Sequence, residues 1–227
     1  PANMGVVPPL PGFNKFLSDI TKKHGALFIL DEVMTGFRIS QGGWWGKFGT
    51  EEDWTPDLFT FGKVIGGGMP LAAVGGSAAV MELLAPSGSV YQAGTLSGNP
   101  VATAAGLATL ELCDSELYTA LDSRAREVGS AISDALIAAD VQHSFQQAGN
   151  LFSFFFTPNN VYNFDKAKKQ DTSAFAVFFH SLLEQGISVP PSAFEAWFVS
   201  GALTDDDVDK IAKAASVAAQ QVRLRSS

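Results

Sequence analysis

A single lysine, Lys63, stands just before a glycine triplet in the stretch FGKVIGGGMPL, residues 61–71. Consecutive glycines cost backbone entropy, so they indicate a place where something must approach the backbone closely. A lysine here can bind phosphate, carry a solvated charge or act as a reactive amine. A phosphate-binding P-loop would place the lysine after the glycines and follow it with Ser or Thr, whereas Val64 follows Lys63. Pro70 likewise interrupts the helix that a dinucleotide-binding fingerprint needs.

A second candidate, Asp31, ends another apolar segment. The runs ALFIL (26–30) and DLFTF (57–61) are short and continuous, as expected of strands in a buried parallel sheet. Ligands of such sheets bind beyond the carboxyl ends of the strands, so Asp31 and Lys63 are expected to face one crevice. This pair suits pyridoxal phosphate, whose aldehyde forms a Schiff base with lysine while an acid keeps the pyridine nitrogen protonated. A salt bridge at the strand ends explains the spacing equally well.

The acidic pair Asp31 and Glu32 leaves a second chemistry open. An apolar strand that ends in acid also holds magnesium in many ATPases, and a lysine with glycines follows further along this chain. The order of lysine and glycine in the stretch 61–71 argues against that interpretation. A metal bound jointly by the two carboxylates would restore it.

Thr95 lies in the third candidate stretch, VYQAGTLSGNP, residues 90–100. Asn99 is expected to cap a helix whose first residue is Pro100. The Thr95 hydroxyl and the amides of the turn around it are suited to binding a phosphate. A capped helix with nothing bound also explains this stretch by itself.

The elements that must position these residues fall into two parts. Up to residue 112, helices alternate with buried strands, which indicates an α/β unit with a mostly parallel sheet. From residue 113 on, the pattern indicates a smaller α+β domain with antiparallel strands. The expected elements of the first part are helices at 13–24 and 100–112 and strands at 26–30 and 57–61. A weaker strand and turn at 71–80 is expected to lead into a short helix near VMELLA, residues 80–85. Those of the second are helices at 115–139, 172–186 and 204–225 and strands at 141–149 and 151–157.

Composition excludes several classes of function. The 227 residues carry a formal net charge of −8 without a basic run, which argues against nucleic-acid binding. No apolar run is long enough to span a bilayer, and a single cysteine, Cys113, excludes a disulfide within the chain. The three histidines, His24, His143 and His180, have no metal-ligand spacing. The opening PANMGVVPPLPG has the character of a loop, so we expect a piece of a longer polypeptide.

Taken together, the motifs resemble one family. LDEVMTGFR (30–38), FGKVIGGGMPL (61–71) and YQAGTLSGNP (91–100) have the order and approximate spacing of the class III aminotransferases, pyridoxal-phosphate enzymes of fold type I. PPSAFEAWFVS (190–200) is similar to the aminomutases of that family. The resemblance implies the latter part of the large cofactor-binding domain at 1–112 and a small α+β domain at 113–227. It also implies that the family's N-terminal half is not present here.

The resemblance also implies roles for single residues. Lys63 resembles the lysine bonded to the cofactor and Asp31 the partner of the pyridine nitrogen. Val33 resembles the residue that packs on one face of the ring. Thr95 resembles a threonine that reaches the phosphate of the neighbouring subunit's cofactor, which implies a homodimer with shared sites. Glu195 resembles an acid near the substrate, with a solvated loop carboxylate as the other interpretation.

The implied function is an intramolecular amino exchange in the cytoplasm that converts glutamate 1-semialdehyde to 5-aminolevulinate, using pyridoxal 5′-phosphate and pyridoxamine 5′-phosphate. The glycine triplet is then expected to leave Lys63 room to swing beside the ring. Neither nucleic acid nor membrane is an expected partner. Two alternatives stay open: an ω-aminotransferase, and a catalytically incomplete fragment that needs its N-terminal half. Arg38, in the strand-end motif, is expected to be structural and is left unassigned.

Overall fold

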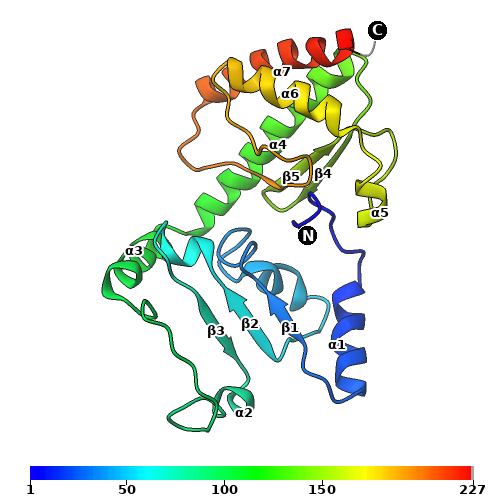
Figure 1. Cartoon of the computed structure of the whole chain (residues 1–227). Coiled ribbons are helices and arrows are strands. Elements are labelled where there is room, and N and C mark those ends of the chain that lie inside the picture. Colours follow the sequence, from blue (N-terminus) through cyan, green and yellow to red (C-terminus); the bar gives the residue numbers. More distant parts are fainter. Residues whose placement is uncertain (226–227) are drawn as a thin grey trace. The chain divides into compact units, whose positions relative to one another are not determined.

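The computed structural model describes residues 1–225 and divides into two compact units (Figure 1). One unit comprises Pro9–Tyr118, and the other comprises Pro1–Pro8 together with the chain from Thr119 on. The sequence placed residues 1–8 with the first unit and the boundary at residue 112. The boundary instead falls inside helix α4 (Ser115–Ala138), whose first turn stays with the first unit. There the Tyr118 hydroxyl donates a hydrogen bond to the Phe37 carbonyl at 2.9 Å.

The Pro9–Tyr118 unit is built on a three-stranded sheet in the order β1 (Ile29–Asp31), β2 (Leu58–Phe61) and β3 (Ala73–Gly76). β1 and β2 are parallel, as predicted, and Asp31 lies opposite Thr60. β3 runs antiparallel to β2, so the prediction of a parallel sheet is wrong for this strand. The connection from β2 holds only a 3₁₀ turn, η2 (Lys63–Gly66), and is too short for the crossover that parallel strands need.

Four further helical segments belong to this unit: α1 (Phe13–Lys23), the π-helical turn η1 (Trp45–Gly49), α2 (Ala78–Met81) and α3 (Pro100–Glu111). α3 begins as predicted, because the Asn99 side chain accepts a hydrogen bond from the Ala102 N–H at 2.9 Å. The predicted burial of the strands is not found in this chain. Ile29 is 55% exposed, and no residue of α1 is buried.

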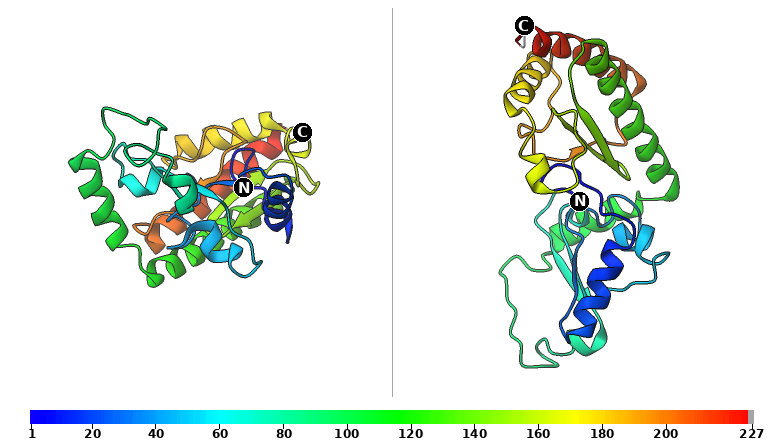
Figure 2. Two further views of the ribbon diagram at one scale, coloured as in Figure 1. Left: turned by 90° about the horizontal axis from the view of Figure 1, so that it is seen from below. Right: turned by 90° about the vertical axis from the view of Figure 1, so that its right-hand side faces the viewer.

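The second unit packs helices on an antiparallel sheet, as the sequence predicted. The strands are β4 (Ser144–Ala148), β5 (Leu151–Phe155) and β6 (Trp197–Phe198), and the helices are α4, α5 (Phe164–Ala167), α6 (Thr172–Glu184) and α7 (Asp205–Arg225). α6 and α7 lie side by side in both views (Figures 1 and 2). Within residues 1–225, no helix has both the length and the apolar character needed to cross a membrane.

Aromatic side chains form the core of this second unit. All five residues of β5 are buried. The ring of Phe154 lies 5.4 Å from that of Trp197 and 5.1 Å from that of Phe145, between centroids. α7 starts at the predicted N-cap, since the Thr204 hydroxyl accepts the Asp207 N–H at 3.2 Å. Aromatic burial and helix capping therefore agree across this unit.

Candidate active site

Asp31 and Lys63 follow the carboxyl ends of two neighbouring parallel strands. The β1–β2 register sets Asp31 opposite Thr60, and Lys63 opens the η2 turn directly after β2. Both side chains are exposed. No ion pair joins them in the described part of the chain, so the salt-bridge interpretation gains no support. The strand ends leave one acid and one amine at the same edge of the sheet, where ligands of such sheets bind.

The Asp31 carboxylate is oriented by its own loop. Its Oδ1 atom accepts the backbone N–H of Val33 at 2.9 Å. An ionised carboxylate has about four lone-pair sites on its two oxygens, so this bond leaves capacity for a further donor. The geometry suits a carboxylate held in place to accept a hydrogen bond from a protonated ring nitrogen.

Glu32 is directed into the protein instead. It is 1% exposed and accepts hydrogen bonds from the N–H groups of Trp44 and Trp45, each at 2.9 Å, and from the Thr35 hydroxyl. Its role is to close the loop after β1. Among residues 1–225, no group of three or more His, Cys, Asp and Glu side chains is placed to hold a metal ion. The magnesium interpretation of the Asp31–Glu32 pair therefore gains no support.

Lys63 adopts a left-handed backbone conformation, with φ 49°. Residues with a Cβ rarely occupy this region, and such outliers gather at functional sites. Two glycines near Lys63 lie very close to the backbone of another segment. A Cβ on Gly67 would lie 2.6 Å from the Ala105 carbonyl, and one on Gly106 would lie 2.1 Å from the Ile65 carbonyl. At Gly67 the triplet thus allows the turn to pack against α3.

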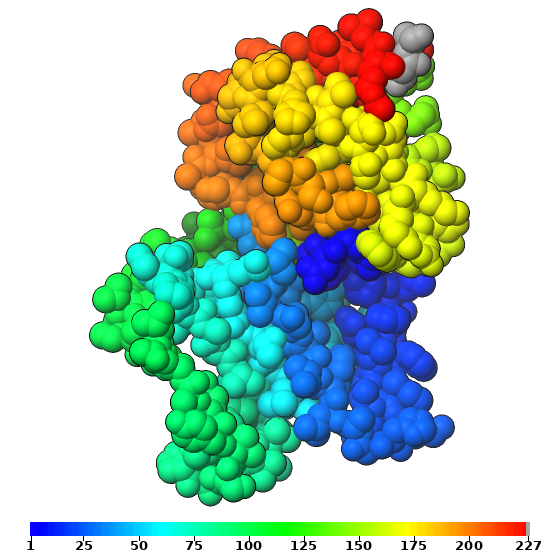
Figure 3. All heavy atoms as spheres, viewed as in Figure 1, coloured from blue at the N-terminus to red at the C-terminus, as the bar shows by residue number. Residues whose placement is uncertain are grey.

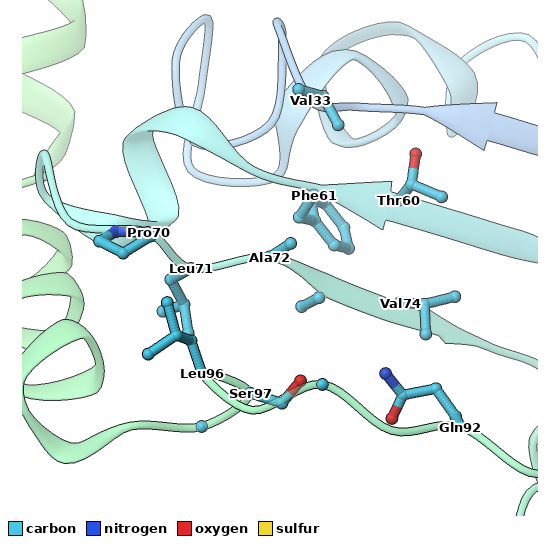
Figure 4. Close-up of a pocket in the computed structure, with 13 residues that line it drawn as sticks. Val33, Thr60, Phe61, Pro70, Leu71, Ala72, Val74, Gln92, Leu96 and Ser97 are labelled. Carbon is cyan, nitrogen blue, oxygen red and sulfur yellow. The ribbon is translucent and has the colours of Figure 1, made fainter.

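A cavity of about 680 Å³ lies beside these residues (Figure 4). It is lined by Val33, by Thr60 and Phe61, by Pro70–Val74 and by Gln92, Gly94 and Leu96–Gly98. In the close-up, Val33 lies on one side of the end of β2, and Leu96, Ser97 and Gln92 lie on the other. A volume of this size suits a small-molecule cofactor or substrate.

One predicted site residue lines this cavity, and the others do not. Val33 is part of the cavity wall, whereas Asp31, Lys63 and Thr95 are absent from it. Each of the three is nonetheless a close chain neighbour of a lining residue. Thr95 itself is exposed, in a turn between Gly94 and Leu96. The structure therefore places four of the five predicted residues in one unit, with one of them in the cavity wall and the others close to lining residues along the chain.

Glu195 belongs to the other unit. Its side chain is exposed, and its N–H donates to the Ser192 carbonyl at 3.2 Å. The sequence did not single out Ser153, whose hydroxyl donates to the Glu195 carbonyl at 2.9 Å. The available signal was a lone serine within the aromatic run LFSFFF, residues 151–156.

Arg38 is half-buried in the Pro9–Tyr118 unit. Burial lowers the pKa of Arg38 below its ordinary value, and the charge of Tyr118 acts in the opposite direction. Burial also raises the pKa of Tyr118, with the neighbouring Cys113 adding to the effect. These three side chains form a cluster under the loop after β1, as the structural interpretation of Arg38 predicted.

Comparison with known proteins identifies the family. The model of the class III aminotransferases matches residues 1–215. A glutamate-1-semialdehyde 2,1-aminomutase from Propionibacterium freudenreichii subsp. freudenreichii is 59% identical over 224 residues, which cover 97% of this chain and 51% of that protein. The chain thus spans about half the length of the curated relatives it matches.

Solved structures share the fold. An omega-transaminase from Sphaerobacter thermophilus superposes with a TM-score of 0.88 at 28% identity, over 97% of this chain and 50% of that one. A glutamate-1-semialdehyde aminomutase from Pseudomonas aeruginosa PAO1, in complex with PMP, gives a TM-score of 0.82 at 24% identity over the same shares. The fold is that of the fold type I transaminases. The chain belongs to the class III aminotransferase family.

Proposed function

We propose that this chain forms the C-terminal part of a glutamate-1-semialdehyde 2,1-aminomutase. That enzyme would move an amino group within one molecule and produce 5-aminolevulinate, an early step of tetrapyrrole synthesis. The observation that carries the proposal is the edge where β1 and β2 end, with exposed Asp31 and Lys63 beside a 680 Å³ cavity. The 59% identity to a protein of that name supports the choice of reaction.

The residues at this edge fit pyridoxal 5′-phosphate and its pyridoxamine form. These residues offer a primary amine and a carboxylate with spare lone pairs, and Val33 contributes an apolar side chain to the cavity wall. When bound, the cofactor supplies an electron sink for the substrate carbon that carries the amine. Asp31 would hold the proton on the ring nitrogen through its carboxylate, and Val33 would pack against one face of the ring.

Lys63 would act through its Nζ atom. The exposed amine would bind the aldehyde carbon of the cofactor, and would take and return the proton at the reacting substrate carbon. Its backbone is fixed at φ 49° by a turn that packs against α3, so the amine starts from a defined place. Glu195 would act as an acid near the substrate, as the family resemblance implies.

Thr95 would donate its hydroxyl to the phosphate of a neighbouring subunit's cofactor, which makes a homodimer part of the proposal. The loop around Thr95 exposes apolar side chains, with Tyr91 at 83% and Leu96 at 61%. Such side chains on one loop favour burial by another chain. We also propose that the enzyme works in the cytoplasm, as the family resemblance implies.

Catalysis would need the half of the enzyme that this chain does not include. Large apolar side chains near the sheet are exposed, among them Phe16 at 59%, Ile29 at 55% and Val74 at 49%. Monomeric proteins rarely leave so many together in water. The missing half would cover them and complete the cofactor site.

The alternative function is that of an ω-aminotransferase, which releases its keto product and takes a second substrate. The similarity to the omega-transaminase fold, with a TM-score of 0.88, favours it. The two activities differ in their need for an amino acceptor. An aminomutase converts glutamate 1-semialdehyde without one, because the amine stays on the same carbon skeleton.

The test uses the complete, cofactor-loaded enzyme with glutamate 1-semialdehyde and no added keto acid. The proposal expects stoichiometric formation of 5-aminolevulinate. A requirement for an added keto acid would support the ω-aminotransferase instead. Borohydride reduction followed by peptide mapping should attach the cofactor to Lys63, and attachment to another lysine would refute its assignment.

A further inference from the structure

The loop that carries Glu195 is held at three successive backbone carbonyls. The carbonyls of residues 193–195 accept one hydrogen bond each, in order, from the Gln170 side-chain amide at 3.1 Å, the Gly5 N–H at 2.6 Å and the Ser153 hydroxyl at 2.9 Å. All the donors lie in the same unit as the loop. A loop fixed at three consecutive residues presents its side chains in a set direction.

Ser153 joins this loop to the start of the chain. It lies in β5 between phenylalanines and is 1% exposed. Its hydroxyl donates to the Glu195 carbonyl and also accepts the Val6 N–H at 2.9 Å. Buried hydroxyls need partners, and this one uses its donor and an acceptor site to connect two segments that are distant in sequence.

The segment Pro1–Pro8 is seated firmly enough to serve as an anchor. Gly5 has φ 80°, and a Cβ there would lie 2.5 Å from the ring of Phe155. Met4 and Phe194 pack against the same apolar cluster, which includes Val7 and Phe155. Figure 3 shows the dark-blue start of the chain against the yellow-to-orange part of its own unit.

We propose that Ser153 is a positioning residue that fixes Glu195 for its work on the substrate. It acts through the Glu195 backbone and ties that loop to Pro1–Pro8 within the same unit. This inference rests on the proposed role of Glu195. It assigns a function to the one hydroxyl in β5, whose other residues are leucine and phenylalanine.

The test is a double-mutant cycle in the complete, cofactor-loaded enzyme. Ser153→Ala is expected to lower kcat/KM about tenfold, the value of roughly one buried hydrogen bond. Ser153→Thr keeps the hydroxyl and should restore most of the loss. In a Glu195→Gln background, Ser153→Ala should cost nothing further, because it acts through Glu195. The control is Ser181→Ala, a buried serine in α6 whose hydroxyl accepts from Gln185 on the same helix at 3.5 Å.

Hydrogen exchange gives a readout independent of turnover. In Ser153→Ala, the amides of Gly5 and Val6 should exchange faster together with those of residues 193–195. Ser181→Ala and Glu195→Gln should leave them unchanged. Faster exchange confined to these two segments would indicate that Ser153 holds them together. A general loss of stability would instead raise exchange throughout the unit.

The outcomes separate the two proposals. Wild-type turnover in Glu195→Gln would overturn the role of Glu195 and, with it, the function assigned to Ser153. An impaired Glu195→Gln enzyme combined with wild-type turnover in Ser153→Ala would overturn the positioning role alone. Equal losses from Ser153→Ala in both backgrounds would also overturn it, because Ser153 would then act independently of Glu195.

Discussion

The two units of this chain differ in how they treat their apolar side chains. In the unit from Thr119 on, Phe152, Phe154 and Phe155 are 1%, 1% and 0% exposed. In Pro9–Tyr118, Phe16 and Ile29 stay more than half exposed. The unit from Thr119 on completes its own core, whereas Pro9–Tyr118 leaves large apolar side chains exposed around its sheet. The proposed cofactor residues Lys63 and Asp31 lie in Pro9–Tyr118, the unit that we propose is incomplete without another part of the enzyme.

The largest expected effect belongs to the incomplete unit. Lys63→Ala should lower kcat of the complete enzyme by at least about 10³-fold, because the amine is the proposed acid–base group. Cofactor should still bind through its phosphate, so absorbance and turnover are measured on the same sample. A variant that turns over at the normal rate would remove Lys63 from the mechanism.

A pair of phenylalanine truncations tests the comparison directly. Phe154→Ala should lower the free energy of unfolding by about 3–5 kcal/mol, because it opens a cavity in a closed core. Phe16→Ala in α1, at 59% exposure, should change it by no more than about 0.5 kcal/mol in this chain. Urea denaturation measures both.

The Phe16→Ala substitution can also be measured in the complete enzyme. If the missing half covers α1, Phe16→Ala becomes a core truncation and its cost should rise to above about 2 kcal/mol. An unchanged small cost there would show that α1 faces water in the complete enzyme as well. The contrast between the units would then need another explanation.

Thr95→Val tests whether the exposed loop meets a second subunit. The substitution keeps the volume and removes the donor, so cofactor retention should weaken by about 0.5–1.5 kcal/mol. Cofactor release and dimer dissociation should occur together on dilution, followed by absorbance and sedimentation. A monomer that holds the cofactor with wild-type affinity would contradict the shared site.

A modest effect is expected from Tyr118, the last residue of the Pro9–Tyr118 unit. Tyr118→Phe removes the hydrogen bond to the Phe37 carbonyl and should cost about 1 kcal/mol of unfolding free energy near neutral pH. Burial raises the pKa of Tyr118 above its ordinary value of 10.0. Its contribution is therefore complete below that value and is lost as the pH rises through the raised one.

Denaturation near neutral pH and at about pH 11 tests whether the contribution of Tyr118 to the free energy of unfolding falls as the pH rises. Wild-type stability should fall more steeply with alkali than that of Tyr118→Phe, so the difference between them should narrow. A difference that widens with pH would mean that the folded state favours the ionised phenol.

The sequence predicted the elements that local signals define. The Asn99 cap, the Thr204 cap and the two strands that bring Asp31 and Lys63 to one edge follow from residue type and spacing. The direction of β3 follows from the short connection after β2, a signal in the sequence that the prediction did not use. The hydrogen bonds of Ser153 join residues 6 and 195, and such a long-range contact could not be read from local patterns.

The glycine triplet also has a contact that the sequence did not reveal. The triplet was expected to serve the lysine, because only the local stretch was in view. Gly67 faces Ala105 on α3, some forty residues further along the chain. A glycine motif shows that something lies close, and only the folded chain shows what it is.

The contact between the η2 turn and α3 has a consequence for engineering. Gly67 and Gly106 bring the two backbones so close that neither segment can be shifted without the other. α3 starts at the Asn99 cap, just after the Thr95 loop, so the same rigid block bears both Lys63 and Thr95. A chimera designed to alter substrate range should therefore exchange residues 60–111 as one cassette, since a graft of the lysine turn alone would meet a foreign helix at backbone distance.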